Sequence, residues 1–206
     1  GVHMRILKGL AVFFLLLSGG LIGAPEGKIE DMTTRIEFPD NVVFESSQGK
    51  VDLKATGVAT RSKFFVRVYS VAHYMENPVV SNATGVLEEV FNPKKVKQLT
   101  LIWVRNVDAK RIQEGFQESF ERTVSRENYE ELRPEIEKFI SMFDSDAKQG
   151  DRYVLRWVSG GNIEVEVNGA KRGEIKGEDF AAATWGIWLG PKSIVNRNKL
   201  ISIFTK

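Results

Sequence analysis

Residues 57–75, GVATRSKFFVRVYSVAHYM, decide the fold that the sequence predicts, because they combine a glycine, a basic stretch and a long alternating segment. Successive side chains of a β-strand point to opposite faces of a sheet, so even and odd positions describe two surfaces. The even positions are mostly apolar and are expected to be buried. The odd positions hold basic and aromatic side chains and a histidine: Arg61, Lys63, Phe65, Arg67, Tyr69, Val71 and His73. We predict one long strand whose odd face either lines a cleft or forms the solvent side of an antiparallel sheet.

More β-structure is predicted on both sides of this segment. The first third of the chain contains short runs of strand-forming residues at 35–38, 42–45 and 51–55. Residues 97–107, KQLTLIWVRNV, form a second long run. Near the C-terminus, Ser-Gly-Gly and Asn-Gly turn signals separate three strands that form a meander, at 151–158, 162–167 and 172–176.

Helical periodicity follows each group of strands. Asp108 is a typical N-cap, and the apolar spacing after it predicts two helices or one helix bent at Pro134. A helix over residues 179–189 and a short one over about 195–204 close the chain. Because strands and helices are grouped and do not alternate as βαβ units, the predicted fold class is α+β, with a mostly antiparallel sheet covered on one face by helices.

The composition narrows the classes of function. The chain has 206 residues, 42% of them hydrophobic and 27% charged, which is typical of one globular domain. It contains no cysteine, which excludes disulfide bonds, thiolate metal sites and a cysteine nucleophile. The glycine motifs of phosphate and dinucleotide sites are absent, as are GxSxG and HExxH. His3 lies in what resembles a cloning remnant, so a metal site or a Ser-His-Asp triad would depend on His73 alone, and no metal site is predicted.

Residues 1–24 predict export. After the remnant, a start methionine, two basic residues, an apolar run and small residues have the layout of a secretory signal, with an uncleaved N-terminal anchor as the alternative. We therefore expect a periplasmic or secreted protein that contacts the membrane only through this segment. Residues 25–34 are interpreted as a polar linker and residues 35–206 as the folded domain. Outside the signal, basic and acidic residues are equal in number, so no nucleic-acid partner is expected.

Several of these segments together resemble the chalcone isomerase-like family, in particular its bacterial secreted branch. The resemblance extends over roughly residues 33–203 and begins with the GVATRSKFF motif at 57–65. It continues through Val68-Tyr69, residues 73–75, residues 101–107, Gly150-Asp151 and residues 177–190. The fold that it implies is an open-faced β-sandwich, in agreement with the predicted α+β class.

The plant enzymes of this family indicate what catalysis would require. In them an arginine, matched here by Arg61, polarises the substrate, while a threonine and a tyrosine hold a water network against the carbonyl. Tyr69 stands near the threonine position, and Asp108 or Ala109 near the tyrosine position. Because a carboxylate opposes the negative charge of a developing enolate, we expect no catalytic residues. An isomerase or intramolecular lyase acting on an unknown enone is the first alternative.

Non-catalytic branches of the family imply a binding function. Fatty-acid-binding members are similar to this chain in retaining the arginine, which meets the ligand carboxylate. A guanidinium can donate two charge-assisted hydrogen bonds to a carboxylate, and a phenol can donate a third. We predict a cleft near Arg61 that binds a small apolar ligand with an acidic group, without a cofactor. The candidate binding residues are Arg61, Tyr69, His73, Tyr74 and Arg105.

Two other interpretations stay open. Fungal members of the family bind haem, and His73 could serve as a single axial ligand. Alternatively, the domain is structural or partner-binding, its cleft is filled, and Arg61 forms a structural ion pair.

Overall fold

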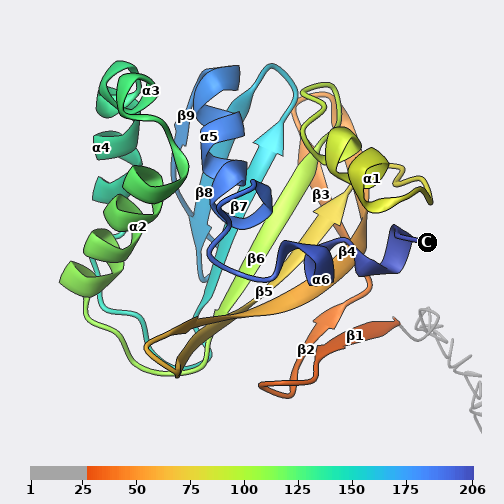
Figure 1. The fold of residues 1–206 in the computed structure, drawn as a ribbon, viewed down its shortest axis with the longest axis horizontal. Coiled ribbons are helices and arrows are strands. Elements are labelled where there is room, and N and C mark those ends of the chain that lie inside the picture. Colours follow the sequence, from red (N-terminus) through yellow and green to blue (C-terminus); the bar gives the residue numbers. More distant parts are fainter. Residues whose placement is uncertain (1–26) are drawn as a thin grey trace, which may run out of the picture.

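A curled antiparallel sheet of seven strands forms the centre of the computed structural model, which describes residues 27–206 (Figure 1). The predicted signal or anchor over residues 1–24 lies outside the described residues. The strands cross the sheet in chain order: β3 (Asn41–Ser46), β4 (Gly49–Lys63), β5 (Val66–Met75), β6 (Lys97–Trp103), β7 (Arg152–Val158), β8 (Asn162–Val167) and β9 (Ala170–Ile175). Two earlier strands, β1 (Lys28–Asp31) and β2 (Ile36–Pro39), form a separate hairpin.

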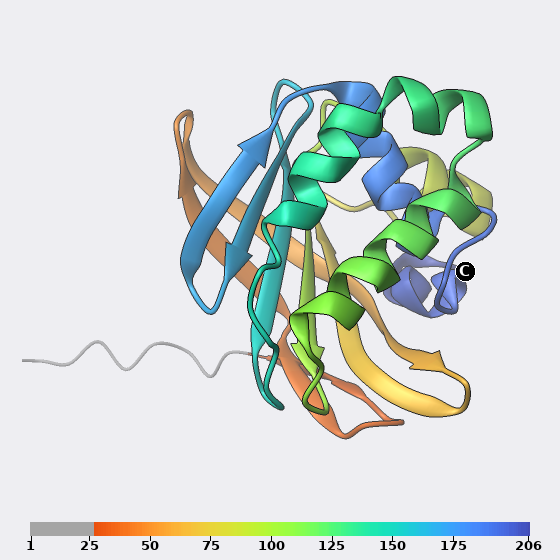
Figure 2. The ribbon, with the colours of Figure 1, turned by 90° about the vertical axis from the view of Figure 1, so that its left-hand side faces the viewer.

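The helices lie on one face of this sheet, as Figure 2 shows. They are α1 (Ala83–Val90), α2 (Ala109–Thr123), α3 (Arg126–Glu131), α4 (Arg133–Ser141), α5 (Glu178–Leu189), α6 (Arg197–Leu200) and a final 3₁₀ turn (Ser202–Phe204). The predicted fold class, α+β with a mostly antiparallel sheet covered on one face, is therefore confirmed. Within residues 27–206, no helix combines the length and the apolar character that a membrane crossing requires.

Local sequence signals explain many of these boundaries. The Asp108 side chain accepts a hydrogen bond from the backbone N–H of Arg111 and caps α2. Pro134 lies in the first turn of α4, where its missing N–H is tolerated, and the periodic region forms three helices where one or two were predicted. The predicted meander is present as β7, β8 and β9, and Asn168-Gly169 makes its second turn with φ angles of 50° and 83°.

The largest departure from the sequence prediction concerns residues 57–75, which contain a hairpin and not one long strand. β4 and β5 run antiparallel and are joined by Phe64-Phe65, whose φ angles of 50° and 64° lie in the left-handed region. Turns of this kind favour Asn-Gly and Asp-Gly, because bulky residues rarely adopt a positive φ. The turn therefore carries no sequence signal, and the alternation runs through it without interruption.

From Tyr69 to Met75 both faces of β5 are covered, so neither face of this part of the strand is the solvent side of the sheet. On one face Tyr69 belongs to the main hydrophobic core, together with Trp188 of α5. On the other face Ala72 and Tyr74 belong to a second cluster, together with Phe38 of β2. The strand is thus enclosed between the helices and the N-terminal hairpin.

The N-terminal hairpin is fastened to the sheet through Asp31, which is 4% exposed. Its carboxylate accepts hydrogen bonds from the hydroxyls of Thr60 (2.6 Å) and Ser70 (2.8 Å), which are paired across β4 and β5. Burial acts to raise the pKa of Asp31, but these hydroxyls and the backbone N–H of Thr33 outweigh it and hold the pKa below its ordinary value. The stretch 25–34, predicted as a linker, therefore contains a strand that is part of the fold.

Candidate functional site

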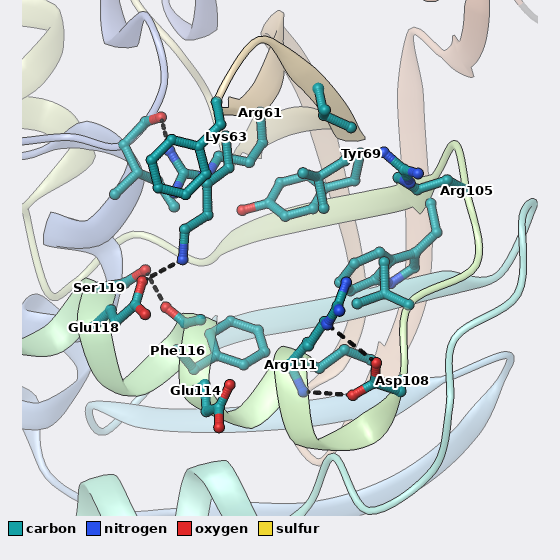
Figure 3. A pocket seen from close by; sticks show the side chains of 18 of the residues that line it. Arg61, Lys63, Tyr69, Arg105, Asp108, Arg111, Glu114, Phe116, Glu118 and Ser119 are labelled. Carbon is teal, nitrogen blue, oxygen red and sulfur yellow. Dashed lines mark hydrogen bonds and ion pairs between the residues drawn. The ribbon is translucent and has the colours of Figure 1, made fainter.

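A pocket of about 590 Å³ lies between the β4–β5 hairpin, the end of β6 and helix α2 (Figure 3). Charged side chains from the hairpin and from α2 surround it. Its apolar and aromatic lining includes Val68, Tyr69, Trp103, Val107, Ile112 and Phe116. A concave, mainly apolar site with a few polar groups is the usual architecture of a binding site for a small organic molecule.

Arg61 and Tyr69 supply polar groups to this pocket. They are directly opposite in the antiparallel register of β4 and β5, and both line the pocket. Arg61 Nη1 donates a hydrogen bond to the Ile194 carbonyl at 2.9 Å, while its other N–H groups have no partner within residues 27–206. Tyr69 Oη accepts a hydrogen bond from Trp188 Nε1 at 3.0 Å, so its own hydroxyl hydrogen is available to a ligand.

The electrostatics of this pair favour an acidic group. Burial raises the pKa of Tyr69 to about 12, although the nearby Arg61 acts to lower it. At neutral pH the phenol is therefore uncharged and can donate a hydrogen bond, and it stands beside a permanent cation. A carboxylate placed between these side chains would receive donors from both.

The charges around the pocket are mostly paired with one another. Lys63 donates a hydrogen bond to Glu118 of α2, and Asp108 pairs with the neighbouring arginine of the same helix (Figure 3). Arg61 and Arg105 differ, because neither forms an ion pair with any residue that the structure describes. These two arginines are therefore the cations in the pocket lining that remain available to neutralise an acid.

Trp103 is a third polar group in the pocket lining. The residue is 3% exposed, and its Nε1 has no hydrogen-bond partner within residues 27–206. Its ring packs edge to face against Tyr69 at 5.4 Å between ring centroids. A buried donor without a partner costs about 1–3 kcal/mol, so this indole is an unsatisfied group beside the pocket.

Three of the five predicted site residues, Arg61, Tyr69 and Arg105, line the pocket. Tyr74 does not, because it has the opposite parity on β5 and points to the other face of the sheet. There its hydroxyl donates a hydrogen bond to the Pro39 carbonyl at 2.8 Å. Tyr74 therefore joins the N-terminal hairpin to the sheet and takes no part in the pocket.

His73 is also absent from the pocket, although it shares the sheet face of Tyr69. It is fully buried, and Trp185 Nε1 donates to its Nε2 at 3.2 Å. Its Nδ1 must then carry the proton and donate to Thr56 Oγ1 at 2.7 Å, while the threonine hydroxyl donates to the Leu200 carbonyl. Burial and the nearby Lys97 lower the pKa of His73 to about 3. Since both ring nitrogens are engaged, His73 offers no nitrogen to haem iron.

Helix α2 contributes pocket residues that were not predicted from the sequence. Gly115 and Ser119 line the pocket four residues apart. A Cβ added to Gly115 would meet no atom within 4 Å, so the glycine borders open space. Small residues one turn apart on a helix that is otherwise rich in long side chains were the available signal.

The part of the chain that the structure describes holds no group of three or more His, Cys, Asp or Glu side chains suited to a metal ion.

Comparisons with known proteins agree with this architecture. The crystal structure of a fatty-acid binding protein from Arabidopsis thaliana matches with a TM-score of 0.71 over 86% of this chain and 96% of that chain. The sequence identity is 13%, so the match shows a shared fold. No curated protein sequence matches the chain. A family model described as chalcone isomerase-like matches residues 31–199, and the chain therefore belongs to the chalcone isomerase-like family.

Proposed function

We propose that the chain binds a small apolar molecule that carries an acidic group, of the fatty-acid type, in the pocket between the β4–β5 hairpin and α2. The observation that carries the proposal is the pairing of Arg61 with Tyr69 at a cavity of about 590 Å³ whose lining combines apolar and aromatic side chains with charged ones. The acid is bound by the guanidinium and the phenol, and the apolar part lies against the aromatic lining.

The energetics of this arrangement support an acid over a neutral ligand. A hydrogen bond to a charged group contributes about 1.5–3 kcal/mol, whereas a neutral one contributes about 0.5–1.5 kcal/mol. Each methylene group of the ligand that leaves water adds about 0.8 kcal/mol. The acid thus sets the orientation of the ligand, and the length of the apolar part sets much of its affinity.

The structural neighbour supports the proposal at the level of the fold. It is a fatty-acid binding protein, and it shares nearly its whole length with this chain. The charges and the lining of the pocket are a second support for the proposed ligand class.

An isomerase reaction on an enone is less well supported by the site. Tyr69 stands where the plant enzymes have a threonine, and Asp108 stands near the position of their tyrosine. Asp108 caps α2 and pairs with an arginine, and it places a negative charge at the pocket where an enolate would need a donor. We expect no conversion of hydroxychalcones above the spontaneous rate, and enzyme-dependent loss of chalcone absorbance would favour the isomerase instead.

Calorimetric titration tests the proposed ligand class. The full chain is titrated with saturated fatty acids of increasing length and with primary alcohols of the same lengths. We expect each acid to bind at least about tenfold more tightly than its alcohol, because the alcohol cannot accept charge-assisted hydrogen bonds. Equal affinities for acid and alcohol would show that the arginine does not select the ligand.

Purification from the source organism complements the titration, because it identifies the natural ligand. Native mass spectrometry of the full chain, followed by solvent extraction, should reveal a bound acid of low molecular mass. A pocket occupied by a neutral molecule would contradict the proposal.

We also propose that the protein acts outside the cytoplasm and belongs to an exported branch of the family. The support is the signal-like pattern of residues 1–24, which lie outside the described residues.

A further inference from the structure

The turn between β4 and β5 exposes apolar side chains to an unusual degree. We call residues 61–68, RSKFFVRV, the hairpin tip. Phe64 is 84% exposed, Phe65 is 105% exposed and Val66 is 41% exposed. Two adjacent aromatic side chains in water, at the most protruding point of a hairpin, serve no packing role in the isolated chain, and such a surface usually marks an interaction site.

The backbone conformation of the turn does not favour phenylalanine at these two positions. Both phenylalanines have a positive φ, a conformation that glycine or asparagine adopts at lower cost. Neither the turn geometry nor the core therefore requires an aromatic residue at these two positions. A role for the side chains outside the folded core accounts for their presence.

The charges of the hairpin tip identify the kind of partner. The tip contains three basic residues, Arg61, Lys63 and Arg67, and no acidic residue. Arg67 is exposed and forms no ion pair with any residue in the described part of the chain. Arg105, equally without an ion pair there, lines the same hollows as Val66. The exposed aromatic pair is thus accompanied by uncompensated positive charge.

Hollows flank the hairpin tip on both sides. Phe64 and Val66 line the ligand pocket, while Phe65 and Val66 line a second, open hollow that contains Arg67 and Arg105. Figure 2 shows this hairpin, in orange-yellow, projecting at the edge of the molecule. A typical protein partner needs roughly 800 Å² of contact on each side, which a projecting tip with hollows around it cannot provide alone. The surface of a lipid bilayer can deform around a projecting tip, so it matches this shape better than the rigid surface of a folded protein does.

We propose that the hairpin tip docks on an anionic lipid bilayer, with Phe64 and Phe65 inserted between the headgroups and with Arg67 and Arg105 facing the lipid phosphates. Aromatic side chains at a bilayer interface bury apolar area, and nearby basic side chains gain from the negative surface potential. Because Phe64 and Val66 also line the ligand pocket, its mouth would open next to the lipid. The contact is independent of the proposed ligand and is tested without one.

The absence of cysteine allows a test that is specific for the tip. In the full chain, Ser62→Cys is labelled with an environment-sensitive fluorophore, since Ser62 is exposed and pairs with Arg67 beside the turn. Val43→Cys is the control, because Val43 is 46% exposed and pairs with Asp52, roughly 35 Å along β4 from the turn. The labelled proteins are mixed with vesicles of phosphatidylcholine alone or with one third phosphatidylglycerol.

We expect the label at residue 62 to shift to the blue and brighten only with the anionic vesicles, while the label at residue 43 stays unchanged. Arg67→Glu should weaken the apparent affinity by roughly tenfold, and salt near 0.5 M should weaken it further. Phe64→Ser with Phe65→Ser should abolish the response. Since both side chains are exposed, the thermal unfolding of that double variant should match the parent, which shows that the loss is not due to misfolding.

Other outcomes would overturn the proposal. Vesicle binding without a change at residue 62 would place the contact elsewhere, for example in residues 1–24. An equal response to neutral vesicles would remove the role of the basic residues. A response that appears without vesicles and grows with protein concentration would identify a second copy of the chain as the partner.

Discussion

Arg61 on β4 and Tyr69 on β5 are directly opposite one another in the sheet register, and both side chains border the same pocket. One is held in place by a backbone carbonyl from the segment after α5, and the other by the indole of Trp188 on α5 itself. The C-terminal part of the chain thus orients both polar groups of a site whose remaining walls come from elements earlier in the chain. Arg61 is expected to contribute mainly to ligand binding, whereas Tyr69 is expected to contribute to both binding and stability. The variants below distinguish these two contributions.

Replacement of Arg61 by lysine should weaken the binding of a fatty acid without unfolding the protein. Lysine keeps the charge but loses the planar two-point geometry, so we expect a loss of about 1.5–3 kcal/mol, roughly tenfold to a hundredfold in affinity. Calorimetric titration measures it. Arg152→Lys is the matched control, since Arg152 is exposed on β7 and outside the pocket. An unchanged affinity with a large drop in melting temperature would make Arg61 a structural residue instead.

Replacement of Tyr69 by phenylalanine should lower both affinity and stability. The hydroxyl accepts a hydrogen bond from Trp188 Nε1, and its loss leaves a buried donor without a partner, at a cost of about 1–3 kcal/mol in the free energy of unfolding. Trp188→Phe removes that donor, so in the double variant the two effects should not add. Urea unfolding of the four proteins measures this coupling, and strictly additive losses would argue against the hydrogen bond.

Replacement of Gly115 by leucine should fill the pocket from the side of α2. An added Cβ meets no atom within 4 Å, so the side chain can enter open space, and the helix should gain about 0.5–1 kcal/mol from the loss of a glycine. Affinity should fall while the melting temperature stays the same or rises. Gly186→Leu on α5 is the control, because a Cβ there also meets nothing within 4 Å and Gly186 does not line the pocket. Retained affinity in Gly115→Leu would place the ligand elsewhere.

Stability should fall below pH 6.5 because of His73. Its pKa is about 3 in the folded protein and near 6.5 in the unfolded chain, so between these values only the unfolded chain binds the proton. The free energy of unfolding should therefore decrease by about 1.4 kcal/mol for each pH unit below 6.5. Urea unfolding between pH 6.5 and 5 measures the slope before most carboxylates titrate. His73→Gln should be less stable at neutral pH but show a flatter slope, and equal slopes would assign the proton to another group.

Residues 1–24 should direct export. Fused to a reporter that lacks its own signal, they should carry it out of the cytoplasm, because two basic residues followed by an apolar run match a secretory signal. The mass of the exported fusion distinguishes a cleaved signal from an anchor. A reporter that stays in the cytoplasm would exclude both.

The sequence predicted the fold class because its main signals are local. Asp108 caps a helix, Asn168-Gly169 turns a hairpin, and the β-forming run from Lys97 becomes the central strand β6. The turn at Phe64-Phe65 could not be predicted, because its residues are those that a strand interior prefers and its positive φ angles are imposed by the flanking strands. An alternating pattern gives the faces of a strand but not the point at which the chain reverses.

The site could be predicted only in part, because strand alternation shows which residues share a face of the sheet but not which elements cover that face. The cross-strand pairing of Arg61 with Tyr69 places the two residues on one face, as their shared odd parity predicted, although residues 57–75 form a hairpin and not one strand. Tyr74 has an even position on β5 and therefore lies on the other face of the sheet. His73 had the right parity but lies further along β5 beneath α5, and no sequence pattern shows how far a helix extends over a sheet.

The hydrogen bonds of Asp31 have a consequence for where the domain can be cut. Its carboxylate joins Thr60 and Ser70, the residue pair next to Arg61 and Tyr69 in the register. A truncated chain that starts at residue 35 would lose this carboxylate, its hydrogen bonds to the β4–β5 strand pair, and the contact of Ile29 with the second cluster. The folded domain therefore includes β1 from Lys28 onward. In a binding assay on a fragment without β1, weak binding could result from a damaged β4–β5 hairpin and would not by itself describe the pocket.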